Sequence, residues 1–252
     1  MAKHKDKTVI VTGGGKGIGF GVCTAFAKEG ANIVITGRTQ ATLDQAAEAL
    51  RQYGVQVLPI VAEGGDEQAV QKVIDKAMAV FGRIDVLINN AQASRSGVPL
   101  AEHTEADFDL AIQSGLYGTF HFMRAAFPHL KETKGRVINF ASAAGISGKS
   151  GQASYAAAKE GIRGLSRVAA TEWGPYGITV NVVCPLVMTE ALAQWREQYP
   201  ALYQKTIDDI PLGRFGDAEG DIGRVCVFLA SEDASFISGE TFQVQGGVGL
   251  RP

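Results

Sequence analysis

The sequence predicts an α/β protein built on one doubly wound parallel sheet of about seven strands, with helices on both faces. Three observations lead to this prediction. Short runs rich in β-branched residues alternate along the chain with segments of helical periodicity. The runs are apolar on both sides, as is typical of strands covered by helices on both faces. No interior linker or repeat interrupts the alternation, so residues 1–252 are expected to form a single domain.

The first part of the chain contains four strands and the three helices between them. Strands are expected at Thr8–Val11, Asn32–Thr36, Val55–Val61 and Ile84–Ile88. The first helix places Ile18, Val22, Ala25 and Phe26 on one face, and Gly30 fits the position just past its end. The second helix carries Leu43, Ala46, Ala47 and Leu50, and the third carries Val70, Val73, Ile74, Ala77 and Phe81 before Gly82.

The second part continues the alternation with one interruption. The expected elements are a helix around Glu105–Leu130, a strand at Arg136–Phe140, a helix over about Ser154–Trp173, a strand at Thr179–Val183, a helix at Ala218–Ala230 and a strand near Thr241–Val244. Residues 186–215 break the rhythm, because Pro200 and Pro211 separate short helical pieces there. Right-handed crossovers in such a sheet place the ligand crevice at the carboxyl ends of the strands.

Composition excludes several classes of function. With 24 basic and 26 acidic residues the formal charge is −2, so the chain lacks the basic surface that nucleic acid binding needs. No apolar run approaches the ~20 residues of a membrane span, and no signal-peptide apolar region precedes Thr8, so a cytoplasmic location without membrane contact is expected. Cys23, Cys184 and Cys226 are expected in the core, and the four histidines lack metal-ligand spacing, so no metal site is predicted.

A glycine-rich turn separates the first strand from the first helix. It is Thr12-Gly13-Gly14-Gly15-Lys16-Gly17-Ile18-Gly19. Glycines permit a tight turn, let main-chain N–H groups approach a pyrophosphate, and let the helix pack close to the strand. The amino end of the helix adds about half a positive charge. The turn therefore predicts a dinucleotide site.

The pattern TGxxxGxG in this turn resembles that of the short-chain dehydrogenase/reductase family. The resemblance continues in family order at Asn89-Asn90-Ala91, Ser142, Tyr155-Ala156-Ala157-Ala158-Lys159, Pro185 with Thr189, and Gly246-Gly247. It implies a Rossmann-like sheet of seven strands, a nicotinamide cofactor, and a homotetramer or homodimer. The candidate cofactor-binding residues are Gly13, Gly15, Lys16, Gly17, Ile18, Gly19, Arg38, Thr39, Glu63, Gly64, Asn90, Ala91, Tyr155, Lys159, Pro185, Val187 and Thr189.

The end of the second strand predicts which nucleotide binds. A carboxylate there pairs the adenosine ribose hydroxyls of NAD, whereas a cation accommodates the 2′-phosphate of NADP. The chain has no acid in Ile35-Thr36-Gly37-Arg38-Thr39, and Arg38 offers a planar donor fork suited to phosphate. Lys16 adds a second cation. The sequence therefore favours NADP(H), although both cations could instead be solvated surface charges.

Tyr155 and Lys159 are the candidate catalytic pair. They lie four residues apart and therefore share one helix face. Free tyrosine has a pKa near 10, and a neighbouring ammonium together with an oxidised nicotinamide is expected to lower it. Tyr155 could then exchange a proton with a carbonyl oxygen, while Ser142 hydrogen-bonds that oxygen at the carboxyl end of the fifth strand. The family resemblance also implies a hydrogen bond from Lys159 to the nicotinamide ribose.

The chain departs from the family pattern at four positions. Gly115 stands where the family has the Asn of NxxGTF. In the family the amide side chain of that Asn supports a helix bend, and here Ser114 or Gln113 could compensate for its loss. Gln92 replaces the glycine of NNAG, and Leu186 replaces the glycine after Pro185. Glu63 stands where an Asp is usual near the adenine.

The substrate crevice is expected between 92–99, 143–152 and the lid region 186–215. The candidate substrate-binding residues are Gln92, Ser142, Tyr155, Leu192 and Trp195. Apolar lid residues favour a medium-sized ketone, steroid-like molecule or 3-oxoacyl group, and ordinary packing of the lid or a subunit contact is the alternative. The function predicted is an NADP(H)-dependent oxidoreductase that interconverts a ketone and a secondary alcohol. A cofactor-binding regulatory protein with a weakened site is the second hypothesis, and a sugar-nucleotide epimerase or dehydratase is the third.

Overall fold

The computed structural model describes residues 3–188 and 190–249 and contains one seven-stranded sheet whose paired strands all run parallel. The strands are β1 (Thr8–Thr12), β2 (Asn32–Gly37), β3 (Val57–Val61), β4 (Val86–Asn89), β5 (Arg136–Phe140), β6 (Thr179–Pro185) and β7 (Thr241–Val244). Their order across the sheet is β3-β2-β1-β4-β5-β6-β7. The predicted doubly wound, single-domain Rossmann-like fold is confirmed.

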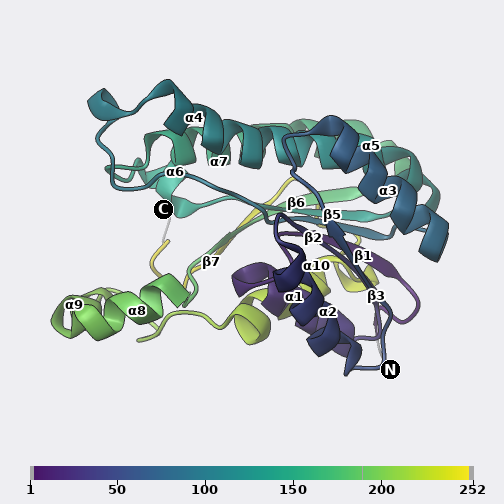
Figure 1. Cartoon of the computed structure of the whole chain (residues 1–252), viewed down its shortest axis with the longest axis horizontal. Helices are drawn as coiled ribbons and strands as arrows, with labels where there is room; N and C mark the ends of the chain where they lie inside the picture. Colours follow the sequence, from purple (N-terminus) through teal and green to yellow (C-terminus); the bar gives the residue numbers. More distant parts are fainter. Residues whose placement is uncertain (1–2, 189, 250–252) are drawn as a thin grey trace.

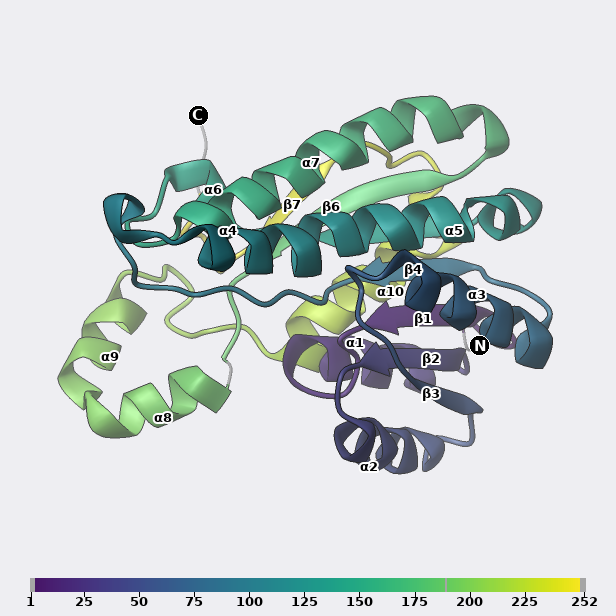
Figure 2. The ribbon, with the colours of Figure 1, turned by 45° about the horizontal axis from the view of Figure 1, so that its top comes forward.

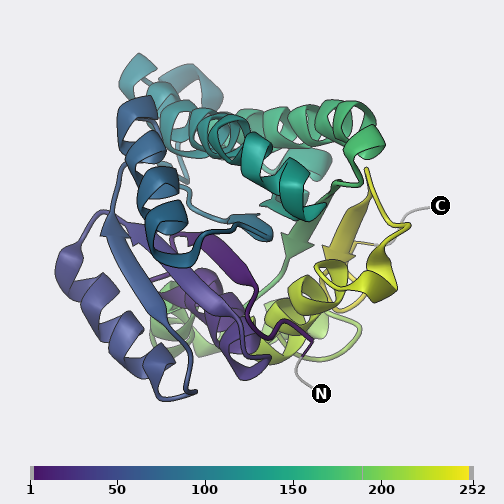
Figure 3. The same ribbon diagram turned by 90° about the vertical axis from the view of Figure 1, so that its right-hand side faces the viewer.

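Helices cover both faces of the sheet (Figures 1 and 3). They are α1 (Gly17–Lys28), α2 (Gln40–Arg51), α3 (Glu67–Phe81), α4 (Glu105–Ala111), α5 (Gly118–Thr133), α6 (Ala143–Ser147), α7 (Ala153–Trp173), α8 (Glu190–Gln198), α9 (Pro200–Asp208) and α10 (Arg224–Leu229). On one face α1, α2 and α10 bury a core that includes Phe26 and Leu50. On the other face α3, α5 and α7 bury a second core that includes Phe122 and Leu130. Burial on both faces explains why the strand sequences are apolar throughout.

The chain reverses its direction across the sheet between β3 and β4. The first three strands are added outward from β1 on one side, and β4 returns to the other side of β1. Loops that leave β1 and β4 therefore diverge and open a crevice at their carboxyl ends. Figure 2 shows these neighbouring strands, with α8 and α9 standing apart from the helical layers beyond the end of β6.

Some elements differ from the sequence prediction. The long helix expected around 105–130 contains a π-helical turn, η2 (Ile112–Tyr117), between α4 and α5. The last helix is likewise η4 (Ala218–Gly223), a π turn, followed by α10. β3 and β4 each begin two residues later than predicted, and α6 was not foreseen because five residues carry no measurable periodicity. Three short 3₁₀ turns complete the described part of the chain, namely η1 (Leu100–Glu102), η3 (Gly174–Tyr176) and η5 (Glu232–Ala234).

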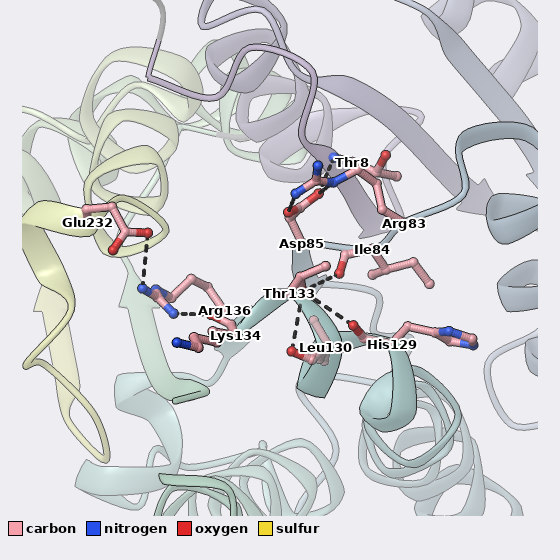
Figure 4. Close-up of polar contacts among 10 residues, drawn as sticks. All are labelled: Thr8, Arg83, Ile84, Asp85, His129, Leu130, Thr133, Lys134, Arg136 and Glu232. Atoms are coloured by element: carbon pink, nitrogen blue, oxygen red, sulfur yellow. Dashed lines mark hydrogen bonds and ion pairs between the residues drawn. The ribbon is translucent and has the colours of Figure 1, made fainter. Parts of the chain in front are cut away.

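A polar network stabilises the amino ends of the central strands (Figure 4). The Asp85 carboxylate accepts a hydrogen bond from the main-chain N–H of Thr8 at 2.9 Å, and Arg83 donates two more at 2.8 and 2.6 Å. Nearby, the Thr133 hydroxyl donates to the carbonyl of Ile84 at 2.7 Å. These groups lie at the sheet edge opposite the crevice, so their role is structural.

The segment 186–215 is helical on both sides of Pro200, as predicted. Pro200 begins α9, where its missing N–H has no intrahelical partner to lose. Of the residues expected in the lid, Thr189 and the side chain of Trp195 lie outside the described part of the chain. Among the described helices, none combines the length and the apolar character that crossing a bilayer requires.

Candidate active site

A cavity of about 430 Å³ opens at the carboxyl ends of β1, β2, β3 and β4. Its lining includes eleven of the predicted cofactor-binding residues, namely Gly13, Gly15, Lys16, Gly17, Ile18, Arg38, Thr39, Glu63, Gly64, Asn90 and Ala91. The sequence pattern missed Thr12, Thr42, Ser114 and Phe122, which also line it. Thr12 is the first residue of TGxxxGxG and could have been found from the motif; the others come near only through the fold.

The glycine turn has the geometry of a main-chain cradle. Gly13 adopts a φ of +68° and Gly17 one of +57°, values that favour glycine. Apart from its chain neighbours and the backbone of α1, no atom of the described chain lies within 4 Å of the place where a Cβ on Gly17 would stand, and Gly17 lines the cavity. Gly19 is different, because a Cβ there would lie 2.3 Å from the carbonyl oxygen of Gly13. Gly19 is buried and lets α1 begin close to β1; it does not line the cavity.

Hydrogen bonds hold the two diverging loops together at their base. Thr12 Oγ1 accepts from the main-chain N–H groups of Asn90 and Ala91, each at 3.0 Å. Asn90 Nδ2 in turn donates to the carbonyl oxygen of Thr12 at 2.9 Å. The sequence pair Asn90-Ala91 is thus fixed against the glycine turn.

Charged side chains line the outer part of the cavity. Arg38 and Lys16 both face it, and neither forms an ion pair with any residue of the described chain. Glu63 lines the same cavity from the end of β3. The cavity therefore combines the glycine turn with two available cations and one carboxylate.

Ser142, Tyr155 and Lys159 come together at the carboxyl end of β5. Ser142 is the N-cap of α6, and its Oγ accepts from the Ala144 N–H at 3.1 Å. The Tyr155 side chain lies near that of Ser142, which lowers the pKa of the phenol. Lys159, one turn further along α7, is 3% exposed and donates from Nζ to the carbonyl oxygen of Phe140 at 2.8 Å. None of the three lines the 430 Å³ cavity, which lies beside them over the neighbouring strands.

Burial shifts the pKa values of both partners. It lowers the pKa of Lys159 to about 8, because a low-dielectric surrounding disfavours the ammonium. It also raises the pKa of the Tyr155 phenol, and the neighbouring Ser142 hydroxyl offsets only part of this effect. The expected lowering of the tyrosine pKa involves an oxidised nicotinamide beside Tyr155 and stays a prediction. Motif spacing shows the cation but not the burial, and burial has the larger effect here.

An amide ladder connects the two halves of the site. Asn89 Nδ2 on β4 donates to Asn139 Oδ1 on β5 at 2.8 Å. Asn139 Nδ2 donates to Ser166 Oγ on α7, also at 2.8 Å. All three side chains are buried, so the helix that carries Tyr155 and Lys159 is tied to the strand that precedes Asn90.

Comparison with known proteins places this arrangement in a family. A family model described as enoyl-(acyl carrier protein) reductase matches residues 13–249. The chain is 57% identical to a 12alpha-hydroxysteroid dehydrogenase from a Clostridium species, with all of both chains covered. It belongs to the short-chain dehydrogenase/reductase family. The protein is therefore an oxidoreductase of that family.

Other members of the short-chain dehydrogenase/reductase family are similar over nearly the whole chain. A 3-oxoacyl-(acyl-carrier-protein) reductase from Staphylococcus aureus is 36% identical, with 96% of this chain and 98% of the relative covered. The crystal structure of a levodione reductase has a TM-score of 0.91 at 32% identity, covering 97% of this chain and 98% of that one. That of an NAD⁺-bound xylitol dehydrogenase has a TM-score of 0.91 at 29% identity, covering 97% and 100%.

The remaining predicted residues lie along the end of β6. Pro185 is paired with Val244 of β7, and Val187 forms an isolated bridge with Gly216. Leu192 is half-buried on α8. None of these three lines the 430 Å³ cavity. Leu186 keeps ordinary main-chain hydrogen bonds with Val244 and Gly216, each at 3.0 Å, so its departure from the family glycine causes no backbone strain.

Proposed function

We propose that this short-chain dehydrogenase/reductase is an NADP(H)-dependent oxidoreductase that interconverts a ketone and a secondary alcohol on a steroid-like substrate. The observation that carries the proposal is the placement of Tyr155 near Ser142, with the buried Nζ of Lys159 5.6 Å from the centre of the Tyr155 ring. The open glycine turn and the available cations beside it fit a phosphorylated dinucleotide. When bound, a nicotinamide supplies or accepts the hydride.

Each catalytic side chain has a separate task in this proposal. Tyr155 keeps its proton at neutral pH because burial raises its pKa, so its phenol can donate to the oxygen of a ketone that is being reduced. Ser142 can donate a second hydrogen bond to the same oxygen as negative charge develops there. Lys159, charged below about pH 8, stabilises the phenolate that Tyr155 becomes after it has donated its proton.

Arg38 and Lys16 support the choice of NADP(H). Arg38 lines the cavity just after β2, where the family resemblance places the adenosine ribose, and Lys16 lines it from the neighbouring turn after β1. No ion pair within the described residues occupies either cation. A guanidinium binds phosphate through two parallel N–H donors. Glu63 lies on the β3 side of the cavity, where it suits the adenine amino group better than a phosphate.

The substrate class is inferred from the lid and from the hydroxysteroid relative. Tyr199, between α8 and α9, and Leu202 of α9 are about half exposed. The ring centroids of Tyr203 and Phe215 are 5.8 Å apart. An apolar surface at the end of β6 suits a fused-ring hydrocarbon. We therefore assign 186–215 as a substrate lid within the single domain, with Gln92, Leu192 and Trp195 as candidate substrate contacts. A 3-oxoacyl thioester is the main competing substrate.

Exposed aromatic side chains support the proposed homodimer or homotetramer. Phe108, Tyr117 and Phe120 are exposed along α4, η2 and α5, and Phe236 is fully exposed before β7. Apolar patches of this kind mark interaction surfaces in water. Light scattering of the purified protein tests this assignment.

The buried thiols of Cys23 and Cys226 support the proposed cytoplasmic location, where such thiols stay reduced.

A turnover screen tests the proposed function. Purified protein is incubated with NADPH or NADH and with keto steroids, small cyclic ketones and 3-oxoacyl thioesters, and nucleotide oxidation is followed. We expect fastest turnover with NADPH and a keto steroid. Fastest turnover with a thioester would overturn the substrate class. Nucleotide binding with no turnover on the whole panel would favour the regulatory protein instead.

A further inference from the structure

The amide of Gln92 fills the space above Gly115. A Cβ placed on Gly115 would lie 2.0 Å from Gln92 Oε1, 2.6 Å from Cδ and 2.8 Å from Nε2. Real Cβ atoms do not approach other heavy atoms this closely. Gly115 has no positive φ, so its backbone does not require glycine. The three nearest atoms all belong to the amide of Gln92, so a side chain at position 115 would require this amide to move.

Hydrogen bonds hold the amide in this place. Gln92 Nε2 donates to the carbonyl oxygens of Ala93 at 3.0 Å and Ala111 at 3.1 Å. Oε1 is buried and accepts no hydrogen bond within the described chain. The donor half of the amide thus joins the loop after β4 to the last residue of α4, and the acceptor half faces Gly115.

The contact coincides with the π turn η2. Ala111 and Leu110 lie just before this turn, and their carbonyl oxygens accept from Gln92 Nε2 and from Ser114 Oγ, the latter at 2.6 Å. Side chains that enter the main-chain ladder of a helix in this way distort it. Ser114 Oγ also accepts from the N–H of Ala93 at 3.0 Å. We call these hydrogen bonds of Gln92 and Ser114 with Ala93, Leu110 and Ala111 the Gln92 bracket. Of the two residues that the sequence suggested as compensating, Ser114 belongs to this bracket, while Gln113 is exposed.

The bracket lies between the nucleotide cavity and the catalytic helix. Gln92, Ala93 and Ser114 line the cavity next to Asn90 and Ala91. On the other side, Leu116 of η2 packs so closely on Gly161 of α7 that a Cβ there would lie 2.8 Å from it. Helix α7 carries Tyr155 and Lys159. A change in the bracket therefore shifts one wall of the cavity relative to this helix.

We propose that Gln92 is a positioning residue whose amide takes the structural place of a side chain at residue 115 and sets the inner width of the nucleotide cavity. A side chain at position 92 and one at position 115 would occupy the same space, and here the amide of Gln92 fills it. In the family pattern the amide belongs to the Asn at position 115, whereas in this chain it comes from position 92 in the loop after β4. The inference deepens the proposed function and rests on its nucleotide site.

A double-mutant cycle tests this inference in the full-length protein. The variants are Gln92→Ala, Gly115→Asn and the two combined, with Gln113→Ala as a matched control because its exposed amide lies in the same turn. Gln92→Glu keeps the size but replaces the two N–H donors by a carboxylate oxygen facing two carbonyls. Each variant is measured for its melting temperature without ligand, for its Kd for NADPH well below that temperature, and for kcat/KM.

We expect each single change at 92 or 115 to raise the Kd for NADPH by about tenfold or more, and Gln92→Glu to do the same. Gly115→Asn alone also lowers the melting temperature, because it collides with Gln92. The combined variant should recover both quantities, and Gln113→Ala should match the unmodified protein. Recovery of Kd and melting temperature together supports the inference.

Two results would overturn the inference without affecting the proposed function. The first is that the changes in Kd and melting temperature caused by the two single substitutions simply add in the combined variant. The second is that the variants melt at a lower temperature while their Kd for NADPH stays unchanged, as expected of a purely structural contact. If the unmodified protein binds neither NADPH nor NADH, the proposed function itself fails and the positioning role with it. The melting temperatures of the cycle then still decide whether residues 92 and 115 share one volume.

Discussion

Nζ of Lys159 lies 5.6 Å from the centre of the Tyr155 ring and is buried between α7 and the end of β5. Removing an ammonium from water is costly, and one hydrogen bond to Phe140 compensates only part of the cost. A buried, weakly compensated cation next to a phenol is unfavourable for stability. Such groups cluster at functional sites, where they serve the reaction at the expense of the fold.

This cost predicts how stability depends on pH. Burial lowers the pKa of Lys159 from 10.5 to about 8 in the folded protein. Between these values the unfolded chain holds a proton that the folded protein has lost, so the free energy of unfolding rises with pH there, by at most about 1.4 kcal/mol per pH unit. Below pH 8 both states hold the proton and this contribution is flat.

Urea unfolding of the nucleotide-free protein and of Lys159→Met, between about pH 7 and pH 9.5, measures this effect. Other groups titrate in both proteins and cancel in the difference. The pH range ends below the ordinary pKa of tyrosine, so that Tyr155, whose pKa is raised in the folded protein, keeps its proton and adds nothing to the difference. The unmodified protein should gain stability relative to the variant as pH rises above 8. Parallel curves would contradict the buried ammonium.

Replacing Tyr155 with Phe removes the proton donor and leaves the ring in place. We expect kcat to fall by about 10²- to 10⁴-fold, as is typical of the loss of a general acid. The Kd for NADPH should change little, because the ring still packs over Lys159. Tyr176→Phe, at a surface tyrosine remote from Ser142, is the matched control and should retain full activity. Full turnover in Tyr155→Phe would exclude the phenol as the acid.

Arg38 should decide between the two nicotinamide nucleotides. Without its guanidinium a 2′-phosphate loses a charge-assisted pair of hydrogen bonds, so Arg38→Ala is expected to weaken NADPH binding by about 10- to 100-fold. Binding of NADH should stay nearly constant. Isothermal titration with both nucleotides measures the ratio, and Lys72→Ala, an exposed cation on α3, controls for the change in net charge. An unchanged NADPH-to-NADH ratio in Arg38→Ala would remove Arg38 from the site.

Elements with strong local signals could be predicted from the sequence. The strand at 136–140 is predicted to the residue, and the strand expected near 241–244 is found there, because apolar runs between turn residues determine both. Helix α3 ends at Gly82, as predicted, because its φ of +70° favours glycine. The glycine turn and Asn90-Ala91 line one cavity, since motifs at the carboxyl ends of neighbouring parallel strands meet.

Features that depend on distant side chains could not be predicted. The π turn η2 involves Gln92, which lies about twenty residues before it in the sequence. Gln92 and Gly115 were recognised as two separate departures from the family pattern, and only the fold shows that they occupy one volume. The direction of the Tyr155 pKa shift depends on burial, which the spacing of YxxxK does not reveal.

The opposite edge of the sheet should affect stability without affecting the site. The Asp85 side chain is 7% exposed and accepts from Thr8 and twice from Arg83, so Asp85→Ala leaves a buried N–H without a partner. We expect a loss of about 2–4 kcal/mol in the free energy of unfolding. Asp233→Ala, which breaks an exposed ion pair with Lys3, should lower the free energy of unfolding by less than about 1 kcal/mol.

Because the crevice lies at the other end of the strands, both variants should keep the Kd for NADPH and the kcat of the unmodified protein at temperatures where they are folded. Urea unfolding and titration with NADPH measure the two quantities. A weakened Kd in folded Asp85→Ala would show that the two edges of the sheet are coupled.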